Sequence, residues 1–381
     1  MPAPRATRPA TSGATRRAAR RTAIALAGLA GLLATACGAS YTAPAEVALP
    51  PEVTVAPPPT VQTRECDNND PALLAISSYD PDLVVTPPGQ FAPGSYMAQI
   101  QQSGKLRVGT SIDTQLFAAV NPATNEIEGF DVDIAKLVAL AIFGGSWKDI
   151  GQRLDLQGIT YAQRIPKVAS GEVDLIAHTM TINCTRWQQV AFSGVYLYAG
   201  QRLLVEQGSP VTDVRDLAGQ TVCVSAGGTS ADEMRELEVS PPIEVIEVGN
   251  QTDCVVAFQQ GQADAIRSDD TVLAGFAAQD PFAQIVGDLL TEEPYGMAIS
   301  LDHPEFVSFV NAVLEDAKLS ANPYPAADDG AAPPPSWGAI YDRWLRPHLG
   351  EPVASLTTDP ATGAVTDTRG PYALAVYGRK P

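Results

Sequence analysis

Residues 178–193, HTMTINCTRWQQVAFS, gather side chains that can carry chemistry. Thr179, Thr181, Cys184 and Arg186 fall within eight positions of one another. A cysteine near an arginine is a candidate nucleophile, because a neighbouring cation favours the thiolate. A thiolate can also bind a metal ion, and in an oxidising compartment the same cysteine forms a disulfide. The choice among the three depends on where the chain resides.

The N-terminus has the layout of an export signal. Residues 1–36 contain six arginines and no acid, and an apolar run occupies residues 22–36. That run is shorter than the roughly 20 apolar residues of a membrane span, and small residues end it as in a cleaved secretory signal. The sequence LATAC resembles a lipoprotein cleavage box, so we predict a signal peptide over residues 1–36 and a lipid anchor on Cys37. The alternative is an ordinary cleaved signal with an incidental cysteine.

The composition excludes some partners for the exported chain. The net charge is −18, and without the six arginines of the leader 19 bases face 43 acids, which gives −24. Such a balance argues against nucleic acid or anionic lipid as the principal partner. Residues 37–72 are rich in Pro, Ala and Thr, which is typical of an extended tether.

Four cysteines follow the predicted anchor: Cys66, Cys184, Cys223 and Cys254. An even number in an exported chain indicates two disulfides, with three possible connectivities. The chain has no CxxC pair and its three histidines are widely spaced, so we expect no metal site. Cys184 is therefore expected to be half of a disulfide rather than a thiolate.

From Gly104 onwards, short apolar runs alternate with helical patterns. The predicted strands are 105–111, 153–160, 172–179, 202–207, 221–226, 243–248 and 263–268. The predicted helices are 131–144, 162–171, 230–237, 253–261 and 336–345. This alternation predicts an α/β fold with mostly parallel sheets and ligand sites at the carboxyl ends of the strands. Beyond Gly350 the sequence is polar and shows no periodicity, so it indicates no regular element.

The segment GFDVDIAKLVALAI, residues 129–142, resembles the diagnostic stretch of family 3 extracellular solute-binding proteins, the amino-acid receptors of ABC importers. Other segments follow in the family's order over residues 97–316, and the similarity is strongest to actinobacterial glutamine/glutamate-binding lipoproteins. The resemblance implies an α/β fold of the two-lobed periplasmic-binding-protein type II class. In that fold two mixed sheets flanked by helices are joined by two hinge strands, here near residues 198–201 and 293–296.

The resemblance also implies a domain organisation and a function. Lobe 1 would span residues 73–198 and 296–349, lobe 2 residues 199–295, and a C-terminal tail residues 350–381. The protein would be a monomer without a cofactor that binds a free glutamate, glutamine, aspartate or asparagine between closing lobes. It would deliver this ligand, at the outer face of the cell membrane, to a permease with a cytoplasmic ATPase.

Two alternatives remain open. One is a sensor that feeds a signalling partner instead of a pump. The other is a dehydratase derived from the same fold, which needs a general acid or base such as His178, Glu292 or Glu293. The two residues that would hold the carboxylate and the ammonium of an amino acid, Arg186 and Asp269, are present, and no nucleophile–base pair is evident. We therefore expect a receptor and no enzyme.

The ligand set follows residue by residue from the resemblance. Arg186 would bind the α-carboxylate, assisted by Thr181, because a guanidinium gives a carboxylate two charge-assisted hydrogen bonds. Asp269 would receive the ammonium, shared with the backbone oxygen near Thr179. Asp270 would be a solvated or capping acid, and a slip of one residue between the two acids stays open. A surface position for Arg186 is the competing interpretation.

A glycine loop precedes the predicted helix at 230–237. Gly228 would let the backbone approach the ligand, and Thr229 would bind its carboxylate at the start of the helix. Tyr161 and Phe117 would be either walls over the ligand or core residues.

Two further residues are candidate cations for a carboxylate on the ligand side chain, Arg164 and His178. His178 would alternatively be a strand residue packed under the cleft. With the lobes assigned by the resemblance, Cys223 and Cys254 fall in lobe 2 and are expected to pair, which leaves Cys66 for Cys184.

Overall fold

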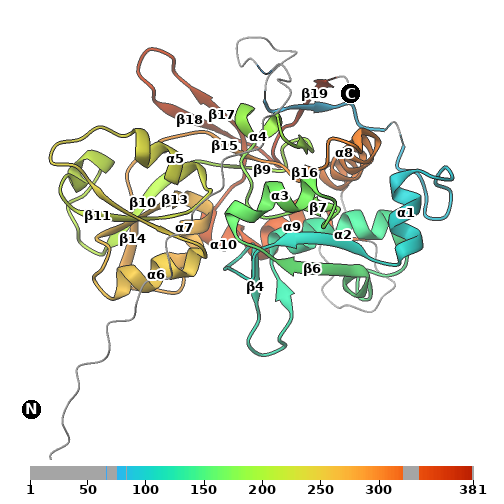
Figure 1. Cartoon of the computed structure of the whole chain (residues 1–381), viewed down its shortest axis with the longest axis horizontal. Coiled ribbons are helices and arrows are strands. Elements are labelled where there is room, and N and C mark those ends of the chain that lie inside the picture. Colours follow the sequence, from blue (N-terminus) through green and yellow to red (C-terminus); the bar gives the residue numbers. More distant parts are fainter. Residues whose placement is uncertain (1–65, 67–74, 83, 321–333, 380–381) are drawn as a thin grey trace, which may run out of the picture. The chain divides into compact units, whose positions relative to one another are not determined.

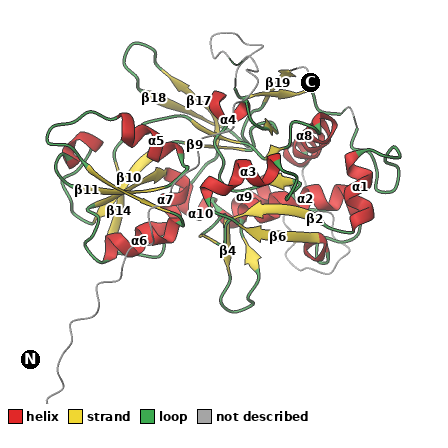
Figure 2. Cartoon of the chain, in the orientation of Figure 1, coloured by secondary structure: helices red, strands yellow, loops and turns green. Residues whose placement is uncertain are grey.

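The computed structural model describes residue 66 and residues 75–82, 84–320 and 334–379 (Figures 1 and 2). The predicted signal peptide, the lipidation site at Cys37 and all of the tether except Cys66 lie outside these residues. Within the described ranges, no helix combines the length and the apolar character that crossing a membrane requires.

The first of two five-stranded sheets has the strand order β6-β2-β7-β16-β8. Strand β2 pairs in parallel with β6 and β7, whereas β16 runs antiparallel to β7 and β8. The sheet is therefore mixed rather than mostly parallel, and we call the part of the chain built on it lobe 1. Its strands are β2 (Leu106–Thr110), β6 (Leu154–Gly158), β7 (Leu175–Ile176), β8 (Ala191–Phe192) and β16 (Ala298–Ile299).

Helices bury the apolar side chains of both faces of this sheet. Leu106 and Val108 belong to one core cluster with residues of α1, α2, α8 and α9, and Ile176 belongs to a second cluster with Val168 of α3. The helices are α1 (Tyr96–Ser103), α2 (Phe130–Phe143), α3 (Arg164–Ala169), α4 (Cys184–Trp187), α8 (Pro304–Leu319), α9 (Trp337–Trp344) and α10 (Arg346–Leu349), with 3-10 turns η1 (Ile150–Arg153) and η2 (Tyr161–Gln163). A small sheet is formed by β3 (Asp113–Thr114), β4 (Ala118–Val120) and β5 (Ile127–Glu128).

The second five-stranded sheet has the order β12-β11-β13-β10-β14, and the part built on it is lobe 2. Leu203 and Val205 pack with residues of α5, whereas Leu204 packs with residues of α6 and α7, so β10 is apolar on both faces. The elements are β10 (Gln201–Glu206), β11 (Thr221–Ser225), β12 (Glu244–Val248), β13 (Ala265–Asp269), β14 (Ala283–Val286), η3 (Val214–Leu217), α5 (Thr229–Glu236), α6 (Gln251–Gln259) and α7 (Asp270–Ala277).

Two antiparallel strands connect the lobes: β9 (Leu197–Ala199) and β15 (Glu293–Tyr295). They overlap the residues, 198–201 and 293–296, where the resemblance implied hinge strands. With two mixed sheets, flanking helices and this double crossover, the predicted type II fold is confirmed.

The C-terminal segment forms strands, which the polar sequence beyond Gly350 did not indicate. Strands β17 (Val353–Thr358) and β18 (Val365–Arg369) form a hairpin, and β19 (Val376–Arg379) pairs in parallel with β1 (Ser77–Tyr79) (Figure 2). Ala354 and Leu356 alternate with more exposed neighbours and are buried. This alternation is short and most of its outward positions are polar, so the sequence pattern alone does not distinguish the strand from a loop.

Candidate ligand-binding site

A pocket lies where lobe 1 and lobe 2 contact each other, and residues of both lobes line it. The lining residues are Tyr161, Arg164, Thr179, Thr181, Arg186, Ser225, Gly228, Thr229, Ser230, Ser268 and Asp269. Most follow the carboxyl ends of strands β7, β11 and β13, which is the expected edge for a ligand site in an α/β fold. The described residues contain no group of three or more His, Cys, Asp or Glu side chains arranged to hold a metal ion.

Arg186 is a buried arginine with spare donors. Its side chain is in α4, is 7% exposed, and donates from Nη1 to the carbonyl of Thr181 (2.8 Å) and from Nη2 to that of Gly227 (3.2 Å). These contacts use two of the five N–H groups of a guanidinium. Burial lowers the pKa of Arg186, and Glu293 and Asp232 oppose that shift. The surface position considered from the sequence is therefore wrong.

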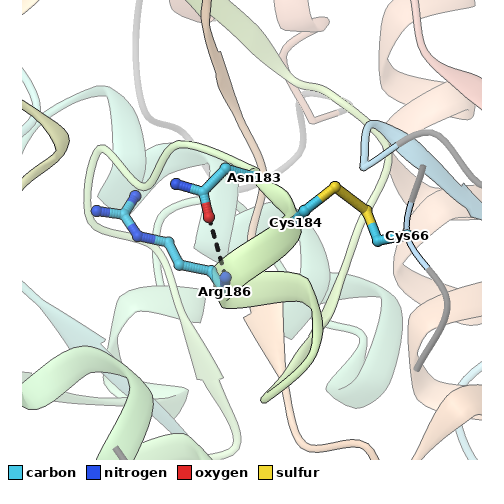
Figure 3. The surroundings of a disulfide bond; sticks show 4 residues. All are labelled: Cys66, Asn183, Cys184 and Arg186. Atoms are coloured by element: carbon cyan, nitrogen blue, oxygen red, sulfur yellow. Dashed lines mark hydrogen bonds between the residues drawn. A yellow bond between two sulfur atoms is a disulfide. The ribbon is translucent and has the colours of Figure 1, made fainter. Parts of the chain in front are cut away.

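Arg186 shares α4 with Cys184, whose sulfur is bonded to Cys66 across a Cα–Cα distance of 5.6 Å (Figure 3). Asn183 caps the helix by accepting a hydrogen bond from the backbone N of Arg186 (2.9 Å). The guanidinium and the disulfide point away from α4 in different directions (Figure 3). The nucleophile and metal-thiolate interpretations of Cys184 are thereby excluded. The second disulfide joins Cys223 to Cys254, so both pairs are those expected from the sequence.

Arg164 also lines the pocket, but most of its donors are occupied by backbone carbonyls. Nε donates to Tyr161, Nη1 to His178 and Thr179, and Nη2 to Gly227, at 3.1–3.2 Å. Burial and the nearby Arg186 lower the pKa of Arg164 to about 9. The backbone oxygen of Thr179, which was expected to take part of the ligand ammonium, is thus already an acceptor for Arg164. Arg164 mainly fixes the loops around the pocket.

Asp269 brings a carboxylate from lobe 2 to the pocket. It ends β13, is 7% exposed, and accepts a hydrogen bond on Oδ2 from the hydroxyl of Tyr295. Burial, followed by the charge of Glu293, raises the pKa of Asp269 well above its usual range. Asp270 is not among the lining residues and caps locally, because it accepts hydrogen bonds from the backbone N of Gly200 (3.2 Å) and of Thr271 (2.8 Å). The geometry favours Asp269 over the neighbouring position.

A buried network beside the pocket centres on Glu293, which the sequence suggested only as a possible general acid or base and not as part of a ligand-binding site. Glu293, 2% exposed, accepts hydrogen bonds from the hydroxyls of Thr181 (2.5 Å) and Thr229 (3.0 Å) on Oε2. On Oε1 it accepts from Gln201 (2.9 Å) and Thr291 (2.7 Å). The predicted position of Glu293 in a strand that connects the lobes could have indicated this role, because a residue there is adjacent to both lobes. With four donors on its two oxygens, this carboxylate is well satisfied.

The glycine loop of lobe 2 approaches lobe 1 closely. Gly227 has φ +79°, and a Cβ at this position would lie 2.8 Å from the Cα of Ala162. Its carbonyl accepts hydrogen bonds from both Arg164 and Arg186. Gly228 is the N-cap of α5 and Thr229 its first residue, so the start of this helix faces the pocket.

Two predicted site residues do not line the pocket. Phe117 is fully buried, and its ring packs edge-on against Phe130 (6.0 Å) and Tyr295 (6.3 Å), so it is a core residue. His178 is 2% exposed and lies edge-on to Tyr161 (4.9 Å). Burial and Arg164 lower the pKa of His178 well below its usual value, so it is neutral. His178 therefore does not serve as the cation considered for a ligand carboxylate.

Residues 106–322 match the family model described as bacterial extracellular solute-binding proteins, family 3. The chain belongs to this family. Among its relatives, the glutamine-binding protein of Geobacillus stearothermophilus is 40% identical over 202 residues, or 53% of this chain and 74% of the relative. The ABC transporter glutamine-binding protein GlnH of Bacillus subtilis is 35% identical over 251 residues, or 66% of this chain and 84% of the relative.

The fold has counterparts among solved structures. Holo ArgBP from T. maritima superposes with a TM-score of 0.53 at 32% identity, covering 59% of this chain and 95% of the other. Membership of the family makes this chain a solute receptor that acts outside the cytoplasm, and the family resemblance seen in the sequence is confirmed.

Proposed function

We propose that the protein is a lipid-anchored receptor of an ABC importer that binds a free, polar α-amino acid between its two lobes. The observation that carries the proposal is that Arg186 of lobe 1 and Asp269 of lobe 2 line one pocket. Each keeps hydrogen-bonding capacity. Within the described part of the chain, Arg186 uses two of its five N–H groups, and the carboxylate of Asp269 accepts one hydrogen bond, from Tyr295. A buried cation and a buried carboxylate on opposite walls match the carboxylate and ammonium of an amino acid.

Binding at this site would favour the closed arrangement of the lobes. A ligand shifts a conformational equilibrium only through contacts that differ between the two states. With its carboxylate on Arg186 and its ammonium on Asp269, an amino acid touches both lobes only when they are together. The backbone N–H of Thr229, at the N-terminus of α5, adds a contact to the ligand carboxylate from lobe 2, since the hydroxyl of Thr229 already donates to Glu293.

The remaining lining favours a neutral polar side chain on the ligand. Once Arg186 and Asp269 are used, the other cation of the lining is Arg164, which has four of its five N–H groups on carbonyls. Outside the lining, Arg267 is paired with Glu233. The rest of the lining carries hydroxyls. Those of Tyr161, Thr179, Thr181 and Thr229 are hydrogen-bonded within the protein, and Ser225, Ser230 and Ser268 add three more. Hydroxyls satisfy an amide without leaving a charge unpaired, so glutamine is the favoured ligand and asparagine its shorter analogue.

Glutamate is the second candidate, and a specific observation supports it. The fifth N–H of Arg164 is not used by a backbone carbonyl, so this guanidinium can still donate to a side-chain carboxylate. Aspartate would reach the same group less well because its side chain is shorter by one methylene.

Calorimetric titration with glutamine, glutamate, asparagine, aspartate and arginine tests the proposal. We expect glutamine to bind most tightly, glutamate next, and both to lose measurable binding in Asp269→Asn. Arginine as the only tight ligand would contradict the charge argument, because it would require an unpaired acid beyond Asp269.

Anchoring and delivery complete the proposal. A lipid on Cys37 and the Pro-rich segment after it would hold the receptor at the outer membrane face while it reaches a permease with a cytoplasmic ATPase. Mass spectrometry of the mature N-terminus tests the lipid, and ligand-dependent stimulation of the ATPase in vesicles distinguishes transport from signalling. Incubation of the protein with each ligand, followed by product analysis, tests the dehydratase alternative.

A further inference from the structure

Away from the pocket, lobe 1 makes a second polar contact with lobe 2. Asp113, in strand β3 of lobe 1, accepts two hydrogen bonds on Oδ2 from Thr252 of α6: from the backbone N (3.1 Å) and from Oγ1 (2.7 Å). The hydroxyl of the next residue, Thr114, lies 3.2 Å from Oε1 of Gln251 and shares its one proton between this oxygen and the nearer Oγ of Ser111 (2.8 Å). Asp113 and Thr114 of lobe 1 thus contact Thr252 and Gln251, the first two residues of α6 in lobe 2.

Helix α6 lacks the cap that its own sequence would supply. Its N-cap residue is Asn250, a type that normally accepts a hydrogen bond from the N2 or N3 amide. Here Asn250 makes no side-chain cap bond and donates instead to Asp253 (3.3 Å). The amide of Thr252, the N2 residue, is bonded to Asp113 of lobe 1. The carboxylate also lies at the positive end of the helix dipole.

The carboxylate of Asp113 is oriented by its own lobe. The hydroxyl of Ser111 donates to Oδ1 of Asp113 (2.7 Å) and accepts from the backbone N of Asp113 (3.1 Å) and of Thr114 (3.0 Å). All of these bonds lie within lobe 1, so separation of the lobes leaves Oδ2 in place to bind α6 again.

We propose that Asp113 is a positioning residue that caps α6 across the lobes and thereby stabilises the closed arrangement. Asp113 is not among the residues that line the pocket, so it acts on ligand affinity only through the lobe equilibrium. The inference rests on the proposed function, since it concerns the closing of the same receptor. The capping contact exists only while the lobes meet, so its loss speeds opening and ligand release.

Stopped-flow measurement of glutamine dissociation tests this role. Hydrogen bonds to charged groups contribute more than neutral ones, so we expect Asp113→Ala to raise the dissociation rate about tenfold, with an association rate within about twofold of the wild type. Thr252→Val should give a smaller rise because the backbone N–H remains, and Thr252→Ser should restore the wild-type rate. The double variant Asp113→Ala/Thr252→Val should be no faster than Asp113→Ala alone, because both changes remove the same contact.

Asp213 offers a matched control. Its carboxylate caps the turn η3 inside lobe 2 by accepting from the backbone N of Arg215 (2.8 Å). Asp213→Ala should leave the dissociation rate unchanged, and circular dichroism should show folded protein for every variant. A wild-type dissociation rate in a folded Asp113→Ala overturns the proposal. Absence of saturable amino-acid binding by the wild type itself overturns the proposed function, and the capping role with it.

Discussion

Cys184 and Arg186 are two residues apart on α4, and their side chains serve different partners: a disulfide to Cys66 and a pocket between the lobes. The helix has only four residues, so the backbone at Arg186 is held by its immediate neighbours rather than by a long run of helical hydrogen bonds. Asn183 supplies one restraint and the disulfide another. The backbone that carries the guanidinium is therefore restrained in part by a covalent bond that takes no part in ligand contact.

Removing that bond should weaken the fold more than the site. We expect the double variant Cys66→Ser/Cys184→Ser to lose about 2–4 kcal/mol of unfolding free energy, because the disulfide closes a loop of over a hundred residues in the unfolded chain. Urea denaturation followed by circular dichroism measures this loss. Glutamine affinity should fall only a few-fold, since Asn183 still caps α4. A loss of all binding in a folded variant would show that the disulfide alone positions Arg186.

Substitution of Arg186 should remove binding without unfolding the protein. For Arg186→Ala we expect the Kd to rise at least about 30-fold, because truncating one member of a buried charge pair costs about 2–5 kcal/mol. Arg186→Lys should recover only part of the loss, since an ammonium does not give the two parallel bonds of a guanidinium. The exposed Arg215, replaced by Ala, is the control and should bind as the wild type does. Equal affinities in the lysine and wild-type proteins would argue against bidentate recognition.

The place of two proposed ligand residues in the fold was predictable from the family resemblance. A free amino acid requires a buried cation and a buried carboxylate, and the two residues to which the resemblance assigned these roles, Arg186 and Asp269, both line the pocket; their contacts with a ligand stay a prediction. The strand–helix alternation likewise predicted seven strands (β2, β6, β7 and β10–β13) and five helices (α2, α3, α5, α6 and α9), whereas β8, β14, β16, α1, α4, α7 and α8 were not predicted. Cysteine pairing followed from assigning residues to lobes, since Cys223 and Cys254 belong to one sheet and the helix packed on it.

Other features depend on contacts between distant segments, which sequence spacing does not reveal. His178 and Phe117 are of suitable types for a site, but their surroundings bury them. Arg164 has the charge of a ligand partner, yet carbonyls from both lobes occupy most of its donors. Glu293 gains its role from four donors spread over more than a hundred residues. Such roles emerge only when the chain is folded.

The raised pKa of Asp269 predicts pH-dependent binding. Burial and the charge of Glu293 raise its pKa in the free protein, whereas the ligand ammonium stabilises the ionised form and lowers it in the complex. At pH values between the pKa of Asp269 in the complex and its pKa in the free protein, binding therefore releases a proton. Affinity should increase as the pH rises toward the pKa of Asp269 in the free protein. Calorimetry in buffers of different ionisation enthalpy measures the released proton. Asp270→Asn should keep this dependence, and a pH-independent affinity would contradict the ionisation of Asp269 on binding.

Gly227 gives the sharpest test of whether closing of the lobes is required. A Cβ on this residue would lie 2.8 Å from the Cα of Ala162. Because the atom it meets belongs to the backbone, a side-chain rotation cannot relieve the clash. We expect Gly227→Ala to raise the Kd at least tenfold, chiefly through faster release, because the variant lobes cannot meet fully. Gly208→Ala is the matched control: Gly208 has a similar φ of +84° but nothing within 4 Å of the added methyl group, so it carries the same backbone strain without the clash. Comparable losses of affinity in the two variants would assign the effect to strain within lobe 2, whereas a loss confined to Gly227→Ala ties it to contact between the lobes.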